Sequence, residues 1–166
     1  MPSASPDSPL SFAIIGCGLI GRKRAAALRG ASLIYACDLD ATRAADLAKS
    51  SPGAKAATDY TAVLADPKVD AVVIAVPPAF HLNLTLQALA AGKHVLTEKS
   101  LAVDLSSAKR MIETARERKL VLMEDFMYRY HSQHEKVFGL LQEGFIGEMR
   151  LMRSAFGFPP LPFDNF

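Results

Sequence analysis

The sequence predicts an α/β protein built on a doubly wound, mainly parallel sheet with helices on both faces. Short aliphatic segments alternate with amphipathic ones along most of the 166 residues, which is the pattern of repeated strand–helix units. Several aliphatic segments are apolar almost throughout, as strands are when helices cover both of their faces. A glycine-rich turn at residues 16–21 also joins the first aliphatic segment to the first amphipathic one, and tight turns of this kind need glycine.

Six strands and five helices are expected in the first 125 residues. The strands are expected at residues 12–16, 33–38, 54–58, 71–76, 94–97 and 120–124, of which 54–58 has the weakest pattern. The helices are expected at residues 19–29, 41–49, 60–65, 80–91 and 104–118. Gly92 follows the fourth helix at the position where a glycine commonly ends a helix.

The pattern changes after residue 125. A further helix is expected at residues 132–142, and residues 148–158 alternate like a strand that has no partner after it. The first ten residues are rich in Ser and Pro and are expected to form a flexible tail. The expected organisation is a tail at 1–10, a domain at 11–125, and the start of a truncated second domain at 126–166 that contains the orphan strand.

Composition narrows the class of protein. The net charge of +2 arises from 19 basic and 17 acidic residues spread along the chain, so no basic block predicts binding to nucleic acid or to a membrane surface. The longest apolar segment, residues 71–80, is too short to span a bilayer, and the N-terminus lacks the pattern of a secretory signal. Two cysteines without metal-ligand spacing predict no metal site and no disulfide framework. Together these features predict a cytoplasmic protein.

The glycine-rich turn has the pattern G-x-G-x-x-G, formed by Gly16, Cys17, Gly18, Leu19, Ile20 and Gly21. Between a strand and a helix, the first glycine allows the tight turn, the second lets the backbone approach a pyrophosphate, and the third lets helix and strand pack closely. The helix N-terminus offers unpaired N–H groups to the phosphates. An ordinary glycine-rich turn is the alternative, but Asp38 follows at the end of the next strand. The turn and this acidic residue together predict a Rossmann-type domain that binds a dinucleotide.

Asp38 is expected to accept hydrogen bonds from the hydroxyls of the adenosine ribose. Its charge would repel a 2′-phosphate, which favours NAD over NADP as the cofactor. The alternative role, capping the next helix, fits Asp40 better because Asp40 immediately precedes that helix. Arg43 lies close enough in the sequence to pair with a phosphate, so NADP stays open as the less favoured cofactor.

The turn after the fourth strand is expected to line the cofactor crevice, because ligands of open α/β sheets bind beyond the carboxyl ends of the strands. Val76, Pro77 and Pro78 form this turn. The prolines fix the loop and remove N–H donors, so we expect an apolar wall against which a nicotinamide lies. His81 begins the next helix, and two interpretations stay open: contact with the cofactor site, or capping of its helix.

Charged residues occur at two other places near this edge of the sheet. Glu98 and Lys99 follow the fifth strand, where they form either an ordinary surface pair or part of the site. A lysine there is suited to polarise a substrate hydroxyl or to take part in proton transfer. In the first helix, Arg22 is a candidate for contact with the cofactor, whereas Lys23 and Arg24 are expected to be solvated surface residues.

The segment after the sixth strand, residues 124–131, is rich in titratable and aromatic side chains. Tyr128 and Arg129 are its candidate hydrogen-bond donors to a substrate. An ordinary loop that joins two domains is the alternative interpretation.

Several motifs follow one another in the chain: the glycine turn at 16–21, VDAVVIAVPPAFH at 69–81, AGKHVLTEKS at 91–100, MEDFMYRYHSQH at 123–134 and IGEMRLMRSAFGF at 146–158. Their combination resembles the glucose-fructose oxidoreductase/inositol dehydrogenase/MocA (Gfo/Idh/MocA) family. The last two motifs are similar to the sugar and dihydrodiol dehydrogenase branches of that family. The resemblance covers essentially the whole chain after the tail.

The resemblance implies an NAD(P)-dependent oxidoreductase that transfers a hydride between the nicotinamide and a hydroxyl or carbonyl carbon of a sugar or cyclic polyol. It implies that Glu98 lies near the nicotinamide ribose, that Lys99 serves substrate binding and proton transfer, and that Tyr128 and Arg129 lie near the substrate. Ser100 stands where the family has a proline. Family members continue into a second domain that supplies the substrate pocket, so we expect this chain to hold the cofactor-binding half and to turn over little by itself.

Two other functions stay open from the sequence. A non-catalytic nucleotide-binding or interaction module would dimerise through the orphan strand, because an unpaired strand edge is a template for another chain. A methyltransferase or another glycine-loop fold would bind a different adenosine ligand. The oxidoreductase is the leading interpretation, and formation of a homo-oligomer is a further expectation.

Overall fold

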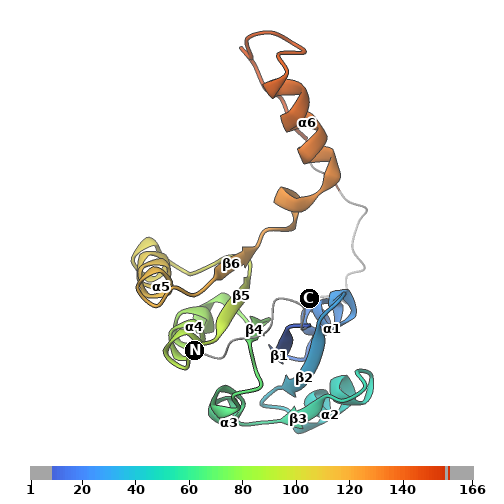
Figure 1. Ribbon diagram of the computed structural model, residues 1–166, viewed down its shortest axis with the longest axis vertical. Helices are drawn as coiled ribbons and strands as arrows, with labels where there is room; N and C mark the ends of the chain where they lie inside the picture. Colours follow the sequence, from blue (N-terminus) through green and yellow to red (C-terminus); the bar gives the residue numbers. More distant parts are fainter. Residues whose placement is uncertain (1–8, 156, 158–166) are drawn as a thin grey trace. The chain divides into compact units, whose positions relative to one another are not determined.

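The computed structural model describes residues 9–155 and 157, and the chain divides into two compact units between Phe126 and Met127 (Figure 1). The first unit contains a sheet in the order β3-β2-β1-β4-β5-β6, in which all paired strands are parallel. Its strands are β1 (Ser11–Ile15), β2 (Ser32–Cys37), β3 (Lys55–Ala57), β4 (Ala71–Ile74), β5 (His94–Glu98) and β6 (Leu122–Asp125). Its helices are α1 (Leu19–Ala27), α2 (Ala41–Lys49), α3 (Tyr60–Ala65), α4 (His81–Ala90) and α5 (Leu105–Glu117), with the 3₁₀ helix η1 (Pro78–Phe80) before α4.

The predicted α/β class and Rossmann-type arrangement are confirmed. The helices predicted at 41–49, 60–65 and 132–142 begin and end at the predicted residues, and every other predicted end in the first unit lies within two residues of the observed one. Of the tail predicted at 1–10, residues 1–8 lie outside the described part. Among the described residues, none of the helices combines the length and apolar character that a membrane crossing requires.

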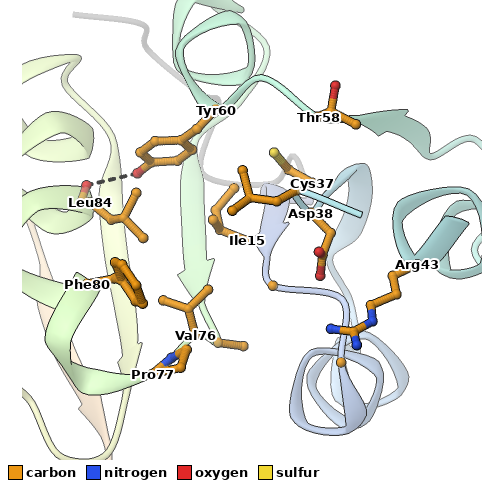
Figure 2. A pocket seen from close by; sticks show the side chains of 14 residues that line it. Ile15, Cys37, Asp38, Arg43, Thr58, Tyr60, Val76, Pro77, Phe80 and Leu84 are labelled. Carbon is orange, nitrogen blue, oxygen red and sulfur yellow. Dashed lines mark hydrogen bonds between the residues drawn. The ribbon is translucent and has the colours of Figure 1, made fainter. Parts of the chain in front are cut away.

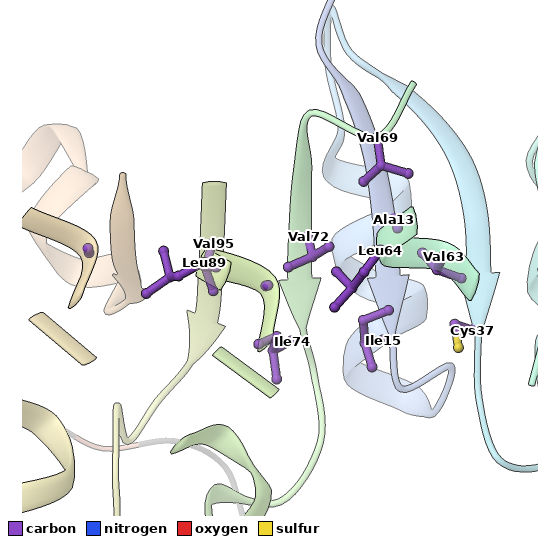
Figure 3. Packing of buried hydrophobic residues seen from close by; sticks show 12 residues of the cluster. Ala13, Ile15, Cys37, Val63, Leu64, Val69, Val72, Ile74, Leu89 and Val95 are labelled. Carbon is purple, nitrogen blue, oxygen red and sulfur yellow. The ribbon is translucent and has the colours of Figure 1, made fainter. Parts of the chain in front are cut away.

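Helices cover both faces of the sheet because its strands are apolar on both faces. In β1, Ala13 and Ile15 pack into a cluster with residues of α3, α4 and α5, whereas Ile14 between them packs into a second cluster with residues of α1 and α2. Figure 3 shows the first cluster, which draws residues from four strands and the helices over them. Each fully buried aliphatic side chain of this kind contributes about 1.5–3 kcal/mol. The sheet is therefore a well-packed platform for the loops at its edge.

The strand order reverses between β1 and β4, which are neighbours in the sheet. The chain leaves β1 through α1 toward β2, and it leaves β4 through α4 toward β5 in the opposite direction. The loops after these two strands therefore diverge. A crevice opens at this point beyond the carboxyl ends of the strands, which is where open α/β sheets bind ligands.

The second unit contains the 3₁₀ helix η2 (Met127–Tyr130) and α6 (Ser132–Gln142). The strand predicted at 148–158 is wrong for the described residues, because 148–155 and 157 form no strand; residues 156 and 158 lie outside the described part. An alternating segment becomes a strand only when a neighbouring strand supplies hydrogen-bond partners, and the described residues of this unit contain none. Pairing of this segment with a second copy of the chain, which the interaction module would need, stays a prediction.

Candidate functional site

The glycine turn between β1 and α1 has three glycines with different surroundings. A side chain at Gly16, where φ is +94°, would collide with the carbonyl group of Ala75, and a side chain at Gly21 would collide with the carbonyl oxygen of Gly16. Nothing lies within 4 Å of the position that a Cβ would take at Gly18. The protein's own packing therefore requires the first and third glycines, whereas the second faces open space, which is what close approach of a pyrophosphate needs.

The N-terminus of α1 has no side-chain cap, unlike those of α2, α3 and α5; α4, which follows η1, also lacks one. Asp40, Asp59 and Asp104 cap α2, α3 and α5 by accepting backbone N–H groups. Hydrogen bonds lower the pKa of each carboxyl group, chiefly from backbone N–H groups for Asp40 and from the Thr61 and Ser106 hydroxyls for Asp59 and Asp104. The start of α1, at Gly18, has no side-chain cap and no acidic residue in its first turn. Its N–H groups and positive dipole end are thus available to an anion.

The residues between the glycines have separate surroundings. The Cys17 side chain is buried in the core, where burial and then the charge of Asp38 raise the pKa of its thiol to about 12. Leu19 and Ile20 are exposed on the first turn of α1. Only the backbone of Cys17 therefore takes part in the site, and its thiol is not a nucleophile at neutral pH.

Asp38 follows β2 and connects the end of this strand to the glycine turn and to the start of α2. One carboxylate oxygen accepts the N–H of Cys17 at 2.7 Å, and the other accepts the N–H of Asp40 at 2.9 Å. Asp40 then caps α2 by accepting N–H groups of Thr42 and Arg43. Asp38 is therefore held against the glycine turn, and the capping role belongs to Asp40 as the sequence predicts.

A cavity of about 480 Å³ lies beyond the ends of β1, β2 and β4 (Figure 2). Asp38 and Arg43 lie on one side of it, and an apolar wall with Val76, Pro77 and Phe80 lies on the other. The remaining lining residues are Ile15, Gly16, Gly18, Cys37, Leu39, Thr58, Tyr60, Ala75 and Leu84. Pro78 is not among them. The apolar wall predicted from the proline turn thus lies in the same cavity as Asp38, the residue expected to bind the adenosine ribose.

Of the two sequence interpretations of His81, capping of its helix is wrong, and contact with the cofactor stays a prediction. The His81 side chain is completely buried, does not line the cavity and does not cap α4. Its ring nitrogens lie 2.8 Å from the carbonyl oxygen of Val76 and 2.9 Å from that of Ser100. His81 therefore links the turn after β4 to the turn after β5.

Glu98 and Lys99 lie at the end of β5, outside the cavity that contains Asp38. Glu98 is the last residue of the strand and is buried, whereas Lys99 is exposed. The peptide bond between Lys99 and Ser100 is cis. The predicted pair thus separates into a buried carboxylate and an accessible ammonium group.

Arg24 is a residue that the sequence interpretation misplaced. It was expected on the solvated surface, but its side chain is only 20% exposed and binds both Glu98 and Asp125. The signal that points to this position is the helical spacing, because Arg24 lies one turn after the buried Gly21 and so shares its face of α1. Arg22 instead is half-exposed and donates its Nε–H to the Cys17 carbonyl oxygen at 3.3 Å.

Tyr128 and Arg129 lie in η2 of the second unit. The Tyr128 ring meets the His134 ring edge-on, with ring centres 6.5 Å apart. Both residues are at least partly exposed. Their expected role in substrate binding stays a prediction.

The residues at the edge of the first unit fit a dinucleotide. The uncapped start of α1 and the open space at Gly18 suit a pyrophosphate, and Asp38 in an apolar cavity suits an adenosine. Among the described residues, no group of three or more His, Cys, Asp or Glu side chains is arranged to hold a metal ion.

Known proteins have sequences similar to most of this chain. The family described as "Oxidoreductase family, NAD-binding Rossmann fold" (GFO_IDH_MocA) matches residues 10–126. The dTDP-3,4-didehydro-2,6-dideoxy-alpha-D-glucose 3-reductase of Actinomadura kijaniata is 38% identical over 165 residues, which cover 98% of this chain and 50% of that protein. The D-glucoside 3-dehydrogenase of Escherichia coli (strain K12) is 35% identical over 90% of this chain and 44% of that protein. The chain thus spans about half the length of the curated relatives it matches.

The comparison with solved structures agrees with the comparison of sequences. A 3-ketoreductase from Actinomadura kijaniata, crystallised with NADP, matches with a TM-score of 0.76 and 37% identity over 84% of this chain and 46% of its own. The myo-inositol 2-dehydrogenase from Lactobacillus plantarum matches with a TM-score of 0.75 and 30% identity over 84% of this chain and 43% of its own. With the family match over residues 10–126, these results show that the chain belongs to the Gfo/Idh/MocA oxidoreductase family with an NAD-binding Rossmann fold.

Proposed function

We propose that this chain binds NAD and is the cofactor-binding half of an oxidoreductase that transfers a hydride to or from a sugar or cyclic polyol. One observation carries the proposal: the start of α1 has no side-chain cap, and its Gly18 faces open space in the same cavity as Asp38. An uncapped helix start, an open glycine and an acidic residue at the next strand end are the three features that a dinucleotide uses.

The proposed orientation places the adenosine in the cavity of Figure 2. Asp38 would accept hydrogen bonds from the ribose hydroxyls, and the exposed side chains of Leu39 and Phe80 would flank the base. The second nucleotide half would then extend from the glycine turn toward the ends of β4 and β5, because a dinucleotide spans the point where the strand order reverses. When bound there, the nicotinamide accepts or supplies the hydride.

Lys99 is the proposed proton-transfer residue on that side of the crevice. It follows directly after β5, is exposed, and is therefore accessible to a substrate. Tyr128 and Arg129 are proposed to bind the substrate, and the sugar class is supported by relatives that are named for sugar reduction and oxidation. Because those relatives are about twice as long, we expect little turnover by this chain by itself.

NAD is the proposed cofactor because the Asp38 carboxylate lies where a 2′-phosphate would sit. NADP is the less favoured choice, supported by Arg43 in the same cavity and by the relative crystallised with NADP. Arg43 lies 3.6 Å from the Asp40 carboxylate, so part of its charge is already offset. We further propose a cytoplasmic protein, since both cysteines are unpaired thiols.

Calorimetric titration of the full chain with NADH, NADPH and S-adenosylmethionine tests the proposal. We expect one NADH site per chain, weaker binding of NADPH, and no binding of S-adenosylmethionine. Gly18→Val is the matched variant, because a Cβ there has no heavy atom within 4 Å and the larger side chain fills the space proposed for the pyrophosphate; it should fold and lose NADH binding. A wild-type chain that binds neither dinucleotide, or that binds S-adenosylmethionine instead, would contradict the proposal.

A further inference from the structure

Arg24, Glu98 and Asp125 form a charged cluster at the carboxyl ends of two neighbouring strands. Glu98 ends β5, Asp125 ends β6, and the two residues are paired in the strand register. The Arg24 Nε atom lies 2.5 Å from a carboxylate oxygen of each. The side chains are 20%, 10% and 15% exposed, respectively. This cluster is largely buried, unlike the other ion pairs among the described residues, whose side chains are about half-exposed or more.

The cluster holds two carboxylates next to one another. Burial is the largest effect on Asp125, and together with the neighbouring Glu98 it raises the pKa of Asp125, while Arg24 acts in the opposite direction. Burial opposes the charge of Arg24, but the hydrogen bond and charge of Glu98 outweigh it and raise the pKa of Arg24. Arg24 is therefore the cation that allows these two strand ends to lie side by side, because two buried carboxylates without it would repel each other.

Lys99 lies immediately after this cluster, in a turn that is fixed on both sides. Arg24 holds Glu98 before it, and beyond it the Ser100 carbonyl oxygen contacts His81 and the Leu101 N–H donates to Glu124 at 2.7 Å. The backbone on either side of Lys99 is thus anchored to three other elements, while the Lys99 side chain is exposed. In this arrangement the backbone of Lys99 is fixed, while its ammonium group is available to a ligand.

The cluster also lies on a defined side of the crevice. Asp38 lies on the β2 side of the point where the strand order reverses, whereas β5 and β6 lie on the β4 side. A dinucleotide that crosses this point with its adenosine at Asp38 places its second half on the side of Glu98. Arg24 belongs to α1, whose start faces the proposed pyrophosphate position. This one helix therefore contributes to the adenosine half and to the nicotinamide half of the proposed site.

We infer that Arg24 is a positioning residue for the nicotinamide half of the site: it holds Glu98, and through Glu98 the turn that carries Lys99, against the end of β6. This inference rests on the proposed function. The role differs from a purely structural one. Loss of a positioning residue should weaken the binding of the ligand half that lies near Glu98 and leave the binding of the half near Asp38 unchanged.

Titration of the full chain with NADH and with ADP separates these two roles, because ADP contains only the adenosine and pyrophosphate part. For Arg24→Gln we expect about tenfold weaker NADH binding, the size of one charge-assisted hydrogen bond, and ADP binding within about twofold of wild type. The emission of bound NADH should also move toward that of free NADH, since it reports the surroundings of the nicotinamide. Lys23→Gln is the matched control, because it removes one exposed positive charge from the same helix.

A second variant addresses folding, since Arg24→Gln leaves two buried carboxylates without their cation. The double variant Arg24→Gln/Glu98→Gln neutralises one of them, and it is compared with Glu98→Gln alone. If Arg24 acts through Glu98, adding Arg24→Gln to Glu98→Gln should not change NADH affinity further. Arg24→Lys, which retains a cation with fewer donors, should recover part of the NADH affinity lost in Arg24→Gln.

The outcomes are distinct. The inference is supported if Arg24→Gln weakens NADH binding but not ADP binding, and if the double variant binds NADH no more weakly than Glu98→Gln. Equal weakening of NADH and ADP, unchanged NADH binding in Arg24→Gln, or an additional loss in the double variant overturns it and leaves the proposed function intact. A wild-type chain that binds neither nucleotide overturns the proposed function and the inference with it.

Discussion

The two sides of the crevice are built in different ways. On the β2 side, the site consists of backbone geometry: two glycines that packing requires, one that faces open space, and a single carboxylate, Asp38, bonded to the glycine turn. On the β5 side, the turn at Lys99 is held by side chains from α1, α4 and β6. The comparison teaches that backbone contacts can hold a glycine turn, whereas the placement of the Lys99 turn depends on side chains far apart in the sequence.

Gly21→Ala should have the largest effect on the β2 side. The new side chain would collide with the Gly16 carbonyl oxygen, which is backbone and cannot move without displacing the turn. We expect a loss of about 3 kcal/mol in the free energy of unfolding, the cost of overpacking a tight site. Urea denaturation measures it, with Gly18→Ala as the control, because a side chain there meets no atom. Equal stability of the two variants would contradict this description of the turn.

His81→Leu should have the next largest effect, because it breaks the link between the turn after β4 and the turn after β5. The Val76 and Ser100 carbonyl oxygens would lose their contact with the imidazole in a buried place. We expect the free energy of unfolding to fall by about 2 kcal/mol, since buried polar groups without partners are costly. His134→Leu, at an exposed position of α6, is the control and should change stability little. Stability equal to wild type in His81→Leu would show that this contact contributes nothing.

The β2 side was predictable from the sequence and the β5 side only in part. The glycine pattern and the spacing to Asp38 are local, and the structure places Asp38 against the turn as those patterns predict. The position of Arg24 depends on which face of α1 meets the sheet edge and on the neighbours β5 and β6, which the sequence of α1 does not contain. The contacts of His81 were not predicted for the same reason, since one of the two, with Ser100, comes from the turn after another strand.

The strand predicted at 148–158 failed for a related reason. Alternation of apolar and polar residues describes which side chains share a face, but pairing needs a neighbouring strand. Residues 148–155 have the alternation and lack the neighbour within the described part of the second unit. Strand formation is therefore a property of the surroundings as well as of the segment.

Asp38→Asn should affect ligand choice more than stability. The amide keeps an acceptor for the Cys17 N–H, loses the one for the exposed Asp40 N–H, and removes the charge that repels a 2′-phosphate. We expect the ratio of NADH to NADPH affinity to fall by about tenfold, the size of one charged contact. Asp40→Asn is the control, because it changes the cap of α2 and not the ribose position. A ratio that is unchanged in Asp38→Asn would sink the assignment of Asp38 to the ribose.

The smallest effect concerns the cap of α5, which connects the two strands of the Lys99 side. Side-chain hydrogen bonds from Ser106 and Ser107, with the Ser107 N–H, lower the pKa of Asp104 from 3.8 to about 2. A lowered pKa means that the ionised cap stabilises the folded state above about pH 4, and that this contribution is lost as the pH falls toward 2. Asp104→Ala should therefore lower the urea midpoint at pH 7 and differ less from wild type near pH 2. A difference that stays constant over this range would contradict the assignment.

The most direct test of the central claim is a titration of the isotope-labelled full chain with NAD and with ADP, followed through the backbone amide resonances. The account predicts that both ligands shift the amides of Gly18, Leu19 and Leu39, and that NAD alone also shifts those of Lys99 and Leu101. Shifts from NAD that stop at the Asp38 side, or that fall elsewhere in the chain, would contradict a cofactor that spans the crevice between the two sides.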